Sequence, residues 1–200
     1  MLYSFNIEEV EMKKRMIQAY EYLTQLVARN DKYFERHEKE FVMNFKRNLA
    51  YAVPDNKRGR KIGYRDIAAR CPYKIHERKK VGRASTRGLA DIQSGRIYLK
   101  KDLPEYDKIE TLLHEWSHVV HAEYCDSFHS MTGFQREVIA GAVAFVVGKC
   151  LNLSFRFAPF YVWLYIPPQY KKEYLNFDYI KQDVFKVADI ILRQLEGREV

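Results

Sequence analysis

Residues 114–118 read His-Glu-Trp-Ser-His, and this pentapeptide constrains the fold more than any other part of the chain. On an α-helix, side chains four positions apart lie on the same face. His114 and His118 on a helix can therefore both direct a ring nitrogen at one metal ion. Glu115 is rotated by about 100° from His114 on such a helix, which suits a base better than a ligand. We expect a helix here that carries a metal site on one face.

The sequence around the pentapeptide favours a helix packed into a core. Apolar residues recur at helical spacing and form one stripe: Ile109, Leu112, Leu113, Trp116 and Val120. Pro104 is suited to the start of this helix, and Glu105 and Asp107 place negative charge in its first turn. An ordinary core helix whose two histidines only pack is the weaker alternative.

The pentapeptide has the form H-E-x-x-H, in which two histidines bind Zn²⁺ and the glutamate is the general base. A tetrahedral zinc then needs a third protein ligand and an open position for water. We favour Glu137, nineteen residues after His118 at the start of an apolar helix with small residues behind it. His129 lies in a loop and is the alternative, which would give a three-histidine site. His121 belongs to the motif helix and is expected to point elsewhere.

The patterns predict an α+β fold, mainly helical, with a small antiparallel sheet beside the H-E-x-x-H helix. Helices are expected over 7–29, 32–50, 64–70, 133–151, 155–165 and 178–196. Strands are expected over 81–93 and 96–99, joined by a turn at Ser94-Gly95. We divide the 200 residues into an N-terminal helical and basic segment, 1–87, and a metal-binding domain, 88–200, packed as one compact unit.

Residues 44–87 form a basic block, with fourteen lysines and arginines against three acidic residues. Because the whole chain carries a net charge of +8, the remainder is slightly acidic. Tyrosines lie between the charges, so the block is a candidate for contact with the phosphates of a nucleic acid. A solvated connecting segment is the alternative, and we favour it because no nucleic-acid-binding motif is recognisable.

No apolar run is long enough to span a bilayer, and residues 1–10 lack a signal-peptide pattern. The three cysteines, Cys71, Cys125 and Cys150, form no C-x-x-C pair, which favours reduced thiols. We therefore expect a cytoplasmic protein without a membrane partner. The sequence indicates no oligomeric state.

Residues 88–196 resemble the zincin superfamily. Thr111-Leu112-x-His114-Glu115-x-x-His118 and Arg136-Glu137-x-x-Ala140 are similar to its T-L-x-H-E-x-x-H and R-E-x-x-A helices. The likeness is to the Glu-ligand branch, the gluzincins, and within it to the zincin-like domain of the ArdC antirestriction proteins of phages and plasmids. Their Tyr-x-x-Trp-Leu type segment is echoed by residues 160–164, and their closing helix by 178–196. The ImmA/IrrE metallopeptidases resemble the motif helix more loosely.

The resemblance has limits. Gly141 stands where the ArdC-like proteins often have a second glutamate. Residues 1–87 do not match the single-stranded-DNA-binding domain of ArdC, so DNA binding is not carried over. SprT-like proteases resemble the chain through the His129 alternative, but their zinc-ribbon cysteines are missing. A phage origin would put the protein in the cytoplasm of the host.

These observations predict a zinc metallopeptidase that acts on a protein or peptide substrate. His114, His118 and Glu137 hold Zn²⁺, and Glu115 takes a proton from the attacking water. Residues 96–99 are expected to form an edge strand that pairs with the substrate. The candidate donors to the developing oxyanion are Tyr161, Tyr165 and His121.

The alternative function is a zincin-fold binding or inhibitor protein of phage or mobile-element type. Such a protein would act on a host or DNA-associated target through residues 44–87. We favour catalysis because the chain retains Glu115, and a purely structural zinc site has no need of that base.

Overall fold

A computed structural model describes residues 7–46, 62–83, 86–153, 155, 162–166 and 178–199. The helices are α1 (Ile7–Lys46), α2 (Tyr64–Ala68), α3 (Glu105–Tyr124), α4 (Gly133–Cys150) and α7 (Asp178–Glu196), with a 3₁₀ helix η1 (Asp126–Ser130). The strands are β1 (Lys74–Arg78), β2 (Gly88–Asp91) and β3 (Arg96–Lys100). The predicted α+β, mainly helical fold class is confirmed.

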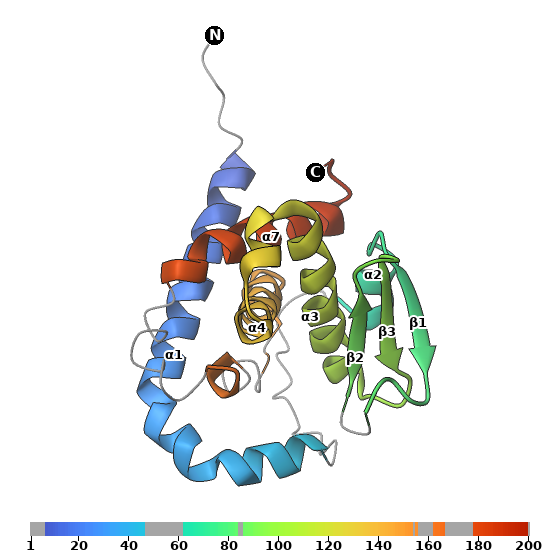
Figure 1. Ribbon diagram of the computed structural model, residues 1–200. Coiled ribbons are helices and arrows are strands. Elements are labelled where there is room, and N and C mark those ends of the chain that lie inside the picture. The colour runs from blue at the N-terminus through green and yellow to red at the C-terminus, as the bar shows by residue number, and fades with distance from the viewer. Residues whose placement is uncertain are drawn as a thin grey trace.

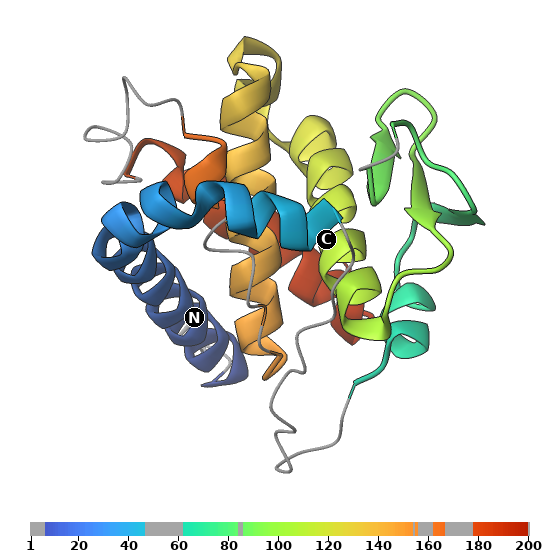
Figure 2. The ribbon, with the colours of Figure 1, turned by 90° about the horizontal axis from the view of Figure 1, so that it is seen from below.

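Helices α3 and α4 pack side by side at the centre of the molecule. Figures 1 and 2 show α1 on one side of this pair and the sheet on the other, while α7 crosses both central helices. Side chains of α1, α3, α4, α7 and the sheet meet in one hydrophobic core. The motif helix therefore lies between the sheet and the helical core.

Helix α4 is the most enclosed element. Nearly every residue from Val138 to Gly148 is buried, as expected for a helix that is apolar on all sides. Thr132 caps its start, accepting a hydrogen bond from the backbone N–H of Gln135, whose side chain bonds back to the N–H of Thr132. The expected helix over 133–151 is thus present, and its first turns face α3.

Helix α1 continues through the Asn30-Asp31 pair, where we expected a break, and our prediction of two helices there was wrong. Asn30 stays helical by donating its side-chain amide to the carbonyl of Leu26, at 2.8 Å. Asp31 accepts a 2.7 Å hydrogen bond from the indole of Trp163. Local and tertiary contacts therefore satisfy two residues that usually favour a turn. Figure 1 shows that α1 bends along its length.

The sheet is mixed, whereas we predicted an antiparallel one. Its strand order is β1-β3-β2: β2 pairs antiparallel with β3, and β1 pairs parallel with β3. We missed β1 because Lys-Ile-His-Glu-Arg contains one apolar residue. The expected strand over 81–93 begins only at Gly88. Gly95, with φ of 60°, makes the predicted turn into β3.

The strand order also corrects the position of the edge strand. Residues 96–99 belong to β3, which is the central strand, so they cannot offer a free edge to a substrate. Strand β2 is at the edge, on the side of α3. Among the described parts of the chain, no helix is long and apolar enough to cross a membrane.

Candidate metal centre

Helix α3 holds the two histidines of the motif at fixed relative positions. The predicted apolar stripe, Ile109 to Val120, is buried as expected. Trp116 is fully enclosed, and its indole donates a 3.0 Å hydrogen bond to the side chain of Gln194 on α7. Because this face anchors the helix, the neighbouring face presents His114 and His118 toward α4.

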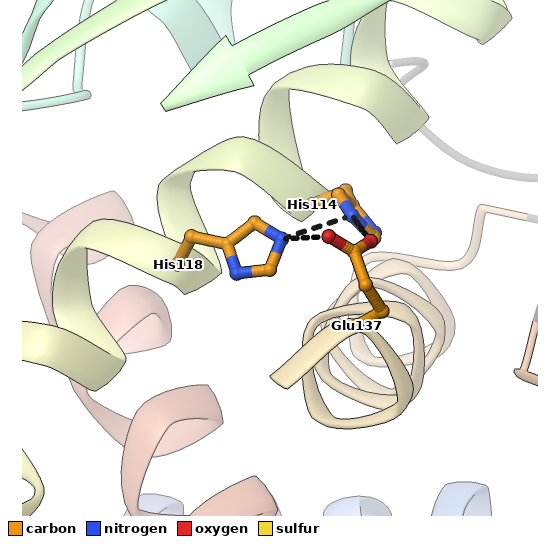
Figure 3. Close-up of side chains that lie close together, drawn as sticks. All are labelled: His114, His118 and Glu137. Carbon is orange, nitrogen blue, oxygen red and sulfur yellow. Dashed lines mark hydrogen bonds and ion pairs between the residues drawn. The ribbon is translucent and has the colours of Figure 1, made fainter. Parts of the chain in front are cut away.

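The site consists of His114, His118 and Glu137, and Figure 3 shows the two imidazole rings of α3 and the carboxylate of α4 turned toward one another. His114 Nε2 lies 3.1 Å from Glu137 Oε2, and His118 Nε2 lies 3.5 Å from Glu137 Oε1. The two Nε2 atoms are 3.2 Å apart. Ligand atoms around a tetrahedral zinc, each about 2.0–2.2 Å from the ion, are separated by about 3.3–3.6 Å. The ring nitrogens and carboxylate oxygens of these three residues therefore have a spacing and a chemistry suited to zinc.

The charges of these groups are coupled. Burial alone would raise the pKa of Glu137, but hydrogen bonds and charge interactions with His114 and His118 hold it well below its ordinary value. Burial alone would lower the pKa of His114, but the hydrogen bond to Glu137 and the neighbouring carboxylates raise it. The carboxylate is thus ionised and ready to bind a cation.

Glu115 lies beside this cluster and against the edge strand. Its side chain is buried, and burial raises the pKa of its carboxyl group, while the charges of His114 and His118 and, less strongly, a backbone hydrogen bond from Ala90 on β2 oppose the rise. A Cβ at Gly88 would lie 2.7 Å from Cγ and Oε1 of Glu115. The absence of a side chain at Gly88 therefore lets β2 approach the carboxylate closely.

A cleft of about 560 Å³ opens over the site. Its walls include the cluster, Glu115, residues 86–90, Phe128, Arg136 and Tyr165. Burial, and the charges of Glu137 and Glu115, raise the pKa of Tyr165 to about 12. Its hydroxyl group therefore remains a hydrogen-bond donor at neutral pH.

The alternative residues lie elsewhere. His129 is exposed on η1 and is not part of the cluster. His121 is buried, with 1% of its side chain exposed, and is not among the residues lining the cleft, so our suggestion that it donates to an oxyanion was wrong. Tyr161 lies outside the described residues, as do 47–61 and 84–85 of the basic block.

Sequence reasoning missed one acidic residue of the cleft. Glu110 lies one turn before His114 on α3 and lines the same cavity. Burial raises its pKa to about 7, and the nearby positive charge of Arg87 opposes that rise. The i, i+4 spacing between Glu110 and His114 was the signal that would have identified it.

No family model, curated protein or solved structure matches this chain. Its function must therefore be inferred from the arrangement of its own residues.

Proposed function

We propose that the protein is a zinc-dependent metallopeptidase, with a zincin-like domain over residues 88–200. The observation that carries this proposal is the convergence of His114, His118 and Glu137 at zinc-ligand spacing, with Glu115 buried beside them. The cleft gives a substrate access to the cluster. When bound there, zinc would lower the pKa of a coordinated water to about 7 and polarise a peptide carbonyl.

Glu115 is the general base in this proposal. Its place next to His114 on α3 puts the carboxylate at the side of the ligand cluster, rather than in it. The contact with Ala90 holds the carboxylate in position. Glu115 accepts a proton from the attacking water and later delivers it to the leaving amine.

In this proposal, Tyr165 supplies the oxyanion donor and strand β2 supplies the edge that binds the substrate. Tyr165 is protonated at neutral pH and lines the cleft, so its hydroxyl group is the donor that stabilises the oxyanion. Gly88, Leu89 and Ala90 of β2 line the same cleft, on the outer edge of the sheet. An extended peptide pairs with this edge through main-chain hydrogen bonds, and its scissile carbonyl then faces the metal site.

The retained base also favours catalysis over the alternative of a binding or inhibitor protein. A site that only held the fold together would need ligands, but no buried carboxylate beside them. Part of the proposed binding region, residues 47–61 and 84–85, lies outside the described residues. No observation on the described residues favours that second function.

The test separates the base from the ligands by substituting Glu115→Gln. The amide cannot accept the proton, so we expect peptide cleavage to fall by at least about 100-fold, while zinc content and fold stay at the wild-type level. Cleavage is measured by profiling peptides released from a denatured proteome, and zinc by elemental analysis.

Glu123→Gln, an exposed carboxylate on the same helix, is the matched control and should cleave like wild type. Equal cleavage by Glu115→Gln and wild-type protein would contradict the proposed mechanism.

A further inference from the structure

A second group of side chains with metal-ligand chemistry lies at the C-terminal end of α3. His121 is near the last turn of α3, Cys125 is the residue that ends the helix, and Asp183 projects from α7. One ligand atom from each of the three residues lies within 4.8 Å of the other two. None of these residues belongs to the proposed catalytic cluster.

The environment of the His121 side chain points to a bound ligand. Its side chain is 1% exposed, and neither ring nitrogen has a hydrogen-bond partner among the described residues. A buried imidazole without hydrogen bonds costs free energy, so such groups are uncommon. The ion-pair partner of His121 is Asp183, whose Oδ2 lies 3.6 Å from His121 Nε2. That separation is too long for a hydrogen bond but equals the edge of a zinc-centred tetrahedron, about 3.3–3.6 Å.

Asp183 is also oriented as a ligand would be. Ser127 of η1 donates a 2.7 Å hydrogen bond from its hydroxyl group to Asp183 Oδ2. Carboxylates that bind metals are commonly fixed by such outer hydrogen bonds. Three segments, the end of α3, η1 and α7, therefore converge on one buried point.

We infer that His121, Cys125 and Asp183 form a second, structural metal site that takes zinc. A thiolate, an imidazole and a carboxylate are a donor set that zinc accepts, whereas Mg²⁺ and Ca²⁺ take oxygen ligands. The thiolate and carboxylate neutralise the double charge of the ion, which permits its burial. Water would complete the tetrahedron as the fourth ligand; most structural zinc sites have a fourth protein ligand in that position.

A thiol nucleophile assisted by His121 and Asp183 is the competing interpretation. Cys125 is 6% exposed, so a substrate has no route to its sulfur. This burial opposes a role for the thiol as a nucleophile.

The site would support one wall of the catalytic cleft. Phe128 of η1 lines the cleft, and its ring lies 5.2 Å from that of His121. The guanidinium of Arg136, on α4, lies 4.7 Å over the same ring. A metal that joins α3, η1 and α7 therefore fixes Phe128.

Cobalt substitution tests the inference without relying on activity. Metal-free protein is titrated with Co²⁺, and the near-ultraviolet thiolate-to-cobalt charge-transfer band is recorded. We expect wild-type protein to show this band, because only the second site contains a sulfur ligand. Cys125→Ala should abolish the band, and Asp183→Asn should weaken binding in the site. Cys150→Ala, which removes another buried thiol, is the control and should keep the band.

Zinc stoichiometry separates the two sites. We expect about two zinc ions per wild-type chain, one in Cys125→Ala and one in Glu137→Gln. A wild-type cobalt complex without the thiolate band would overturn the second site, and this result needs no variant that might fail to fold. A band that survives in Glu137→Gln, with no loss of zinc in that variant, would instead count against the catalytic site alone.

Discussion

At the scale of single residues, the candidate catalytic centre depends on contacts that exist before any metal binds. The carboxylate of Glu137 already lies within 3.5 Å of a ring nitrogen of each histidine. The ionised carboxylate and the two imidazoles are held by packed helices, so binding an ion requires little reordering of side chains. Exchange of one donor should therefore affect metal affinity directly, rather than through the fold.

The third ligand is tested by comparing two variants. Glu137→Gln replaces a charged ligand by a neutral amide, and we expect it to lose most of the zinc held by His114 and His118. His114→Ala and His118→Ala should lose the same zinc ion. His129→Ala should keep it, because His129 is exposed on η1. Elemental analysis after dialysis measures the zinc content of each variant. If His129→Ala lost zinc and Glu137→Gln kept it, the result would support the three-histidine site and contradict Glu137 as the third ligand.

At the scale of elements, strand β2 approaches α3 closely beside Glu115. A Cβ at Gly88 would lie 2.6 Å from Cγ2 of Thr111 and 2.7 Å from Oε1 of Glu115. Separations this short require the strand or the helix to shift. The packing of these two elements therefore determines both stability and the position of the Glu115 carboxylate.

Gly88→Ala should accordingly lower the free energy of unfolding by about 1–3 kcal/mol, as is typical of overpacking. We also expect weaker peptide cleavage, because the new methyl group displaces Glu115. Urea denaturation measures the first effect and cleavage assays the second. Gly133→Ala is the control, since a Cβ there meets no atom within 4 Å. A Gly88→Ala protein as stable and active as wild type would contradict the close contact between β2 and α3.

The sequence predicted the elements whose patterns are local. The apolar stripe of α3 and the continuous apolar run of α4 identified both central helices, and helical geometry placed His114 beside His118. It missed β1, whose single apolar residue gives no alternating pattern. It also placed a break between two helices at Asn30-Asp31, because the hydrogen bond from Trp163 to Asp31 is a contact between distant segments.

Choosing between Glu137 and His129 required knowledge of tertiary structure. Both residues follow His118 in the chain, and either side chain has the chemistry of a zinc ligand. The path of residues 125–132 determines which of these two side chains lies beside the histidines of α3. That path includes η1, which carries His129 to the surface. No pattern of apolar spacing encodes such a turn.

At the scale of the whole molecule, part of the basic block lies on β1, the edge strand on the opposite side of the sheet from β2. Lys74, Arg78, Lys79 and Lys80 are exposed on or just after β1. Some of this charge is already used within the fold, since the guanidinium of Arg78 lies 4.2 Å over the ring of Tyr98. Strand β3 separates β1 from β2, which lines the cleft. A phosphate contact here would therefore be independent of zinc.

The last prediction concerns DNA. If the basic block is a solvated connecting segment, as we favour, binding to single- or double-stranded DNA should be no tighter than the ~10⁻⁴–10⁻⁶ M of non-specific attraction at physiological salt. Replacing Lys57, Arg58, Arg60 and Lys61 by alanine should then change affinity little and leave zinc content unaltered. Fluorescence anisotropy at several salt concentrations measures the DNA affinity of the wild-type protein and of the fourfold variant. Submicromolar affinity in wild-type protein would contradict this expectation. In that case log K should fall with log salt by about 0.7–0.9 per phosphate neutralised, and the fourfold variant should show a shallower slope.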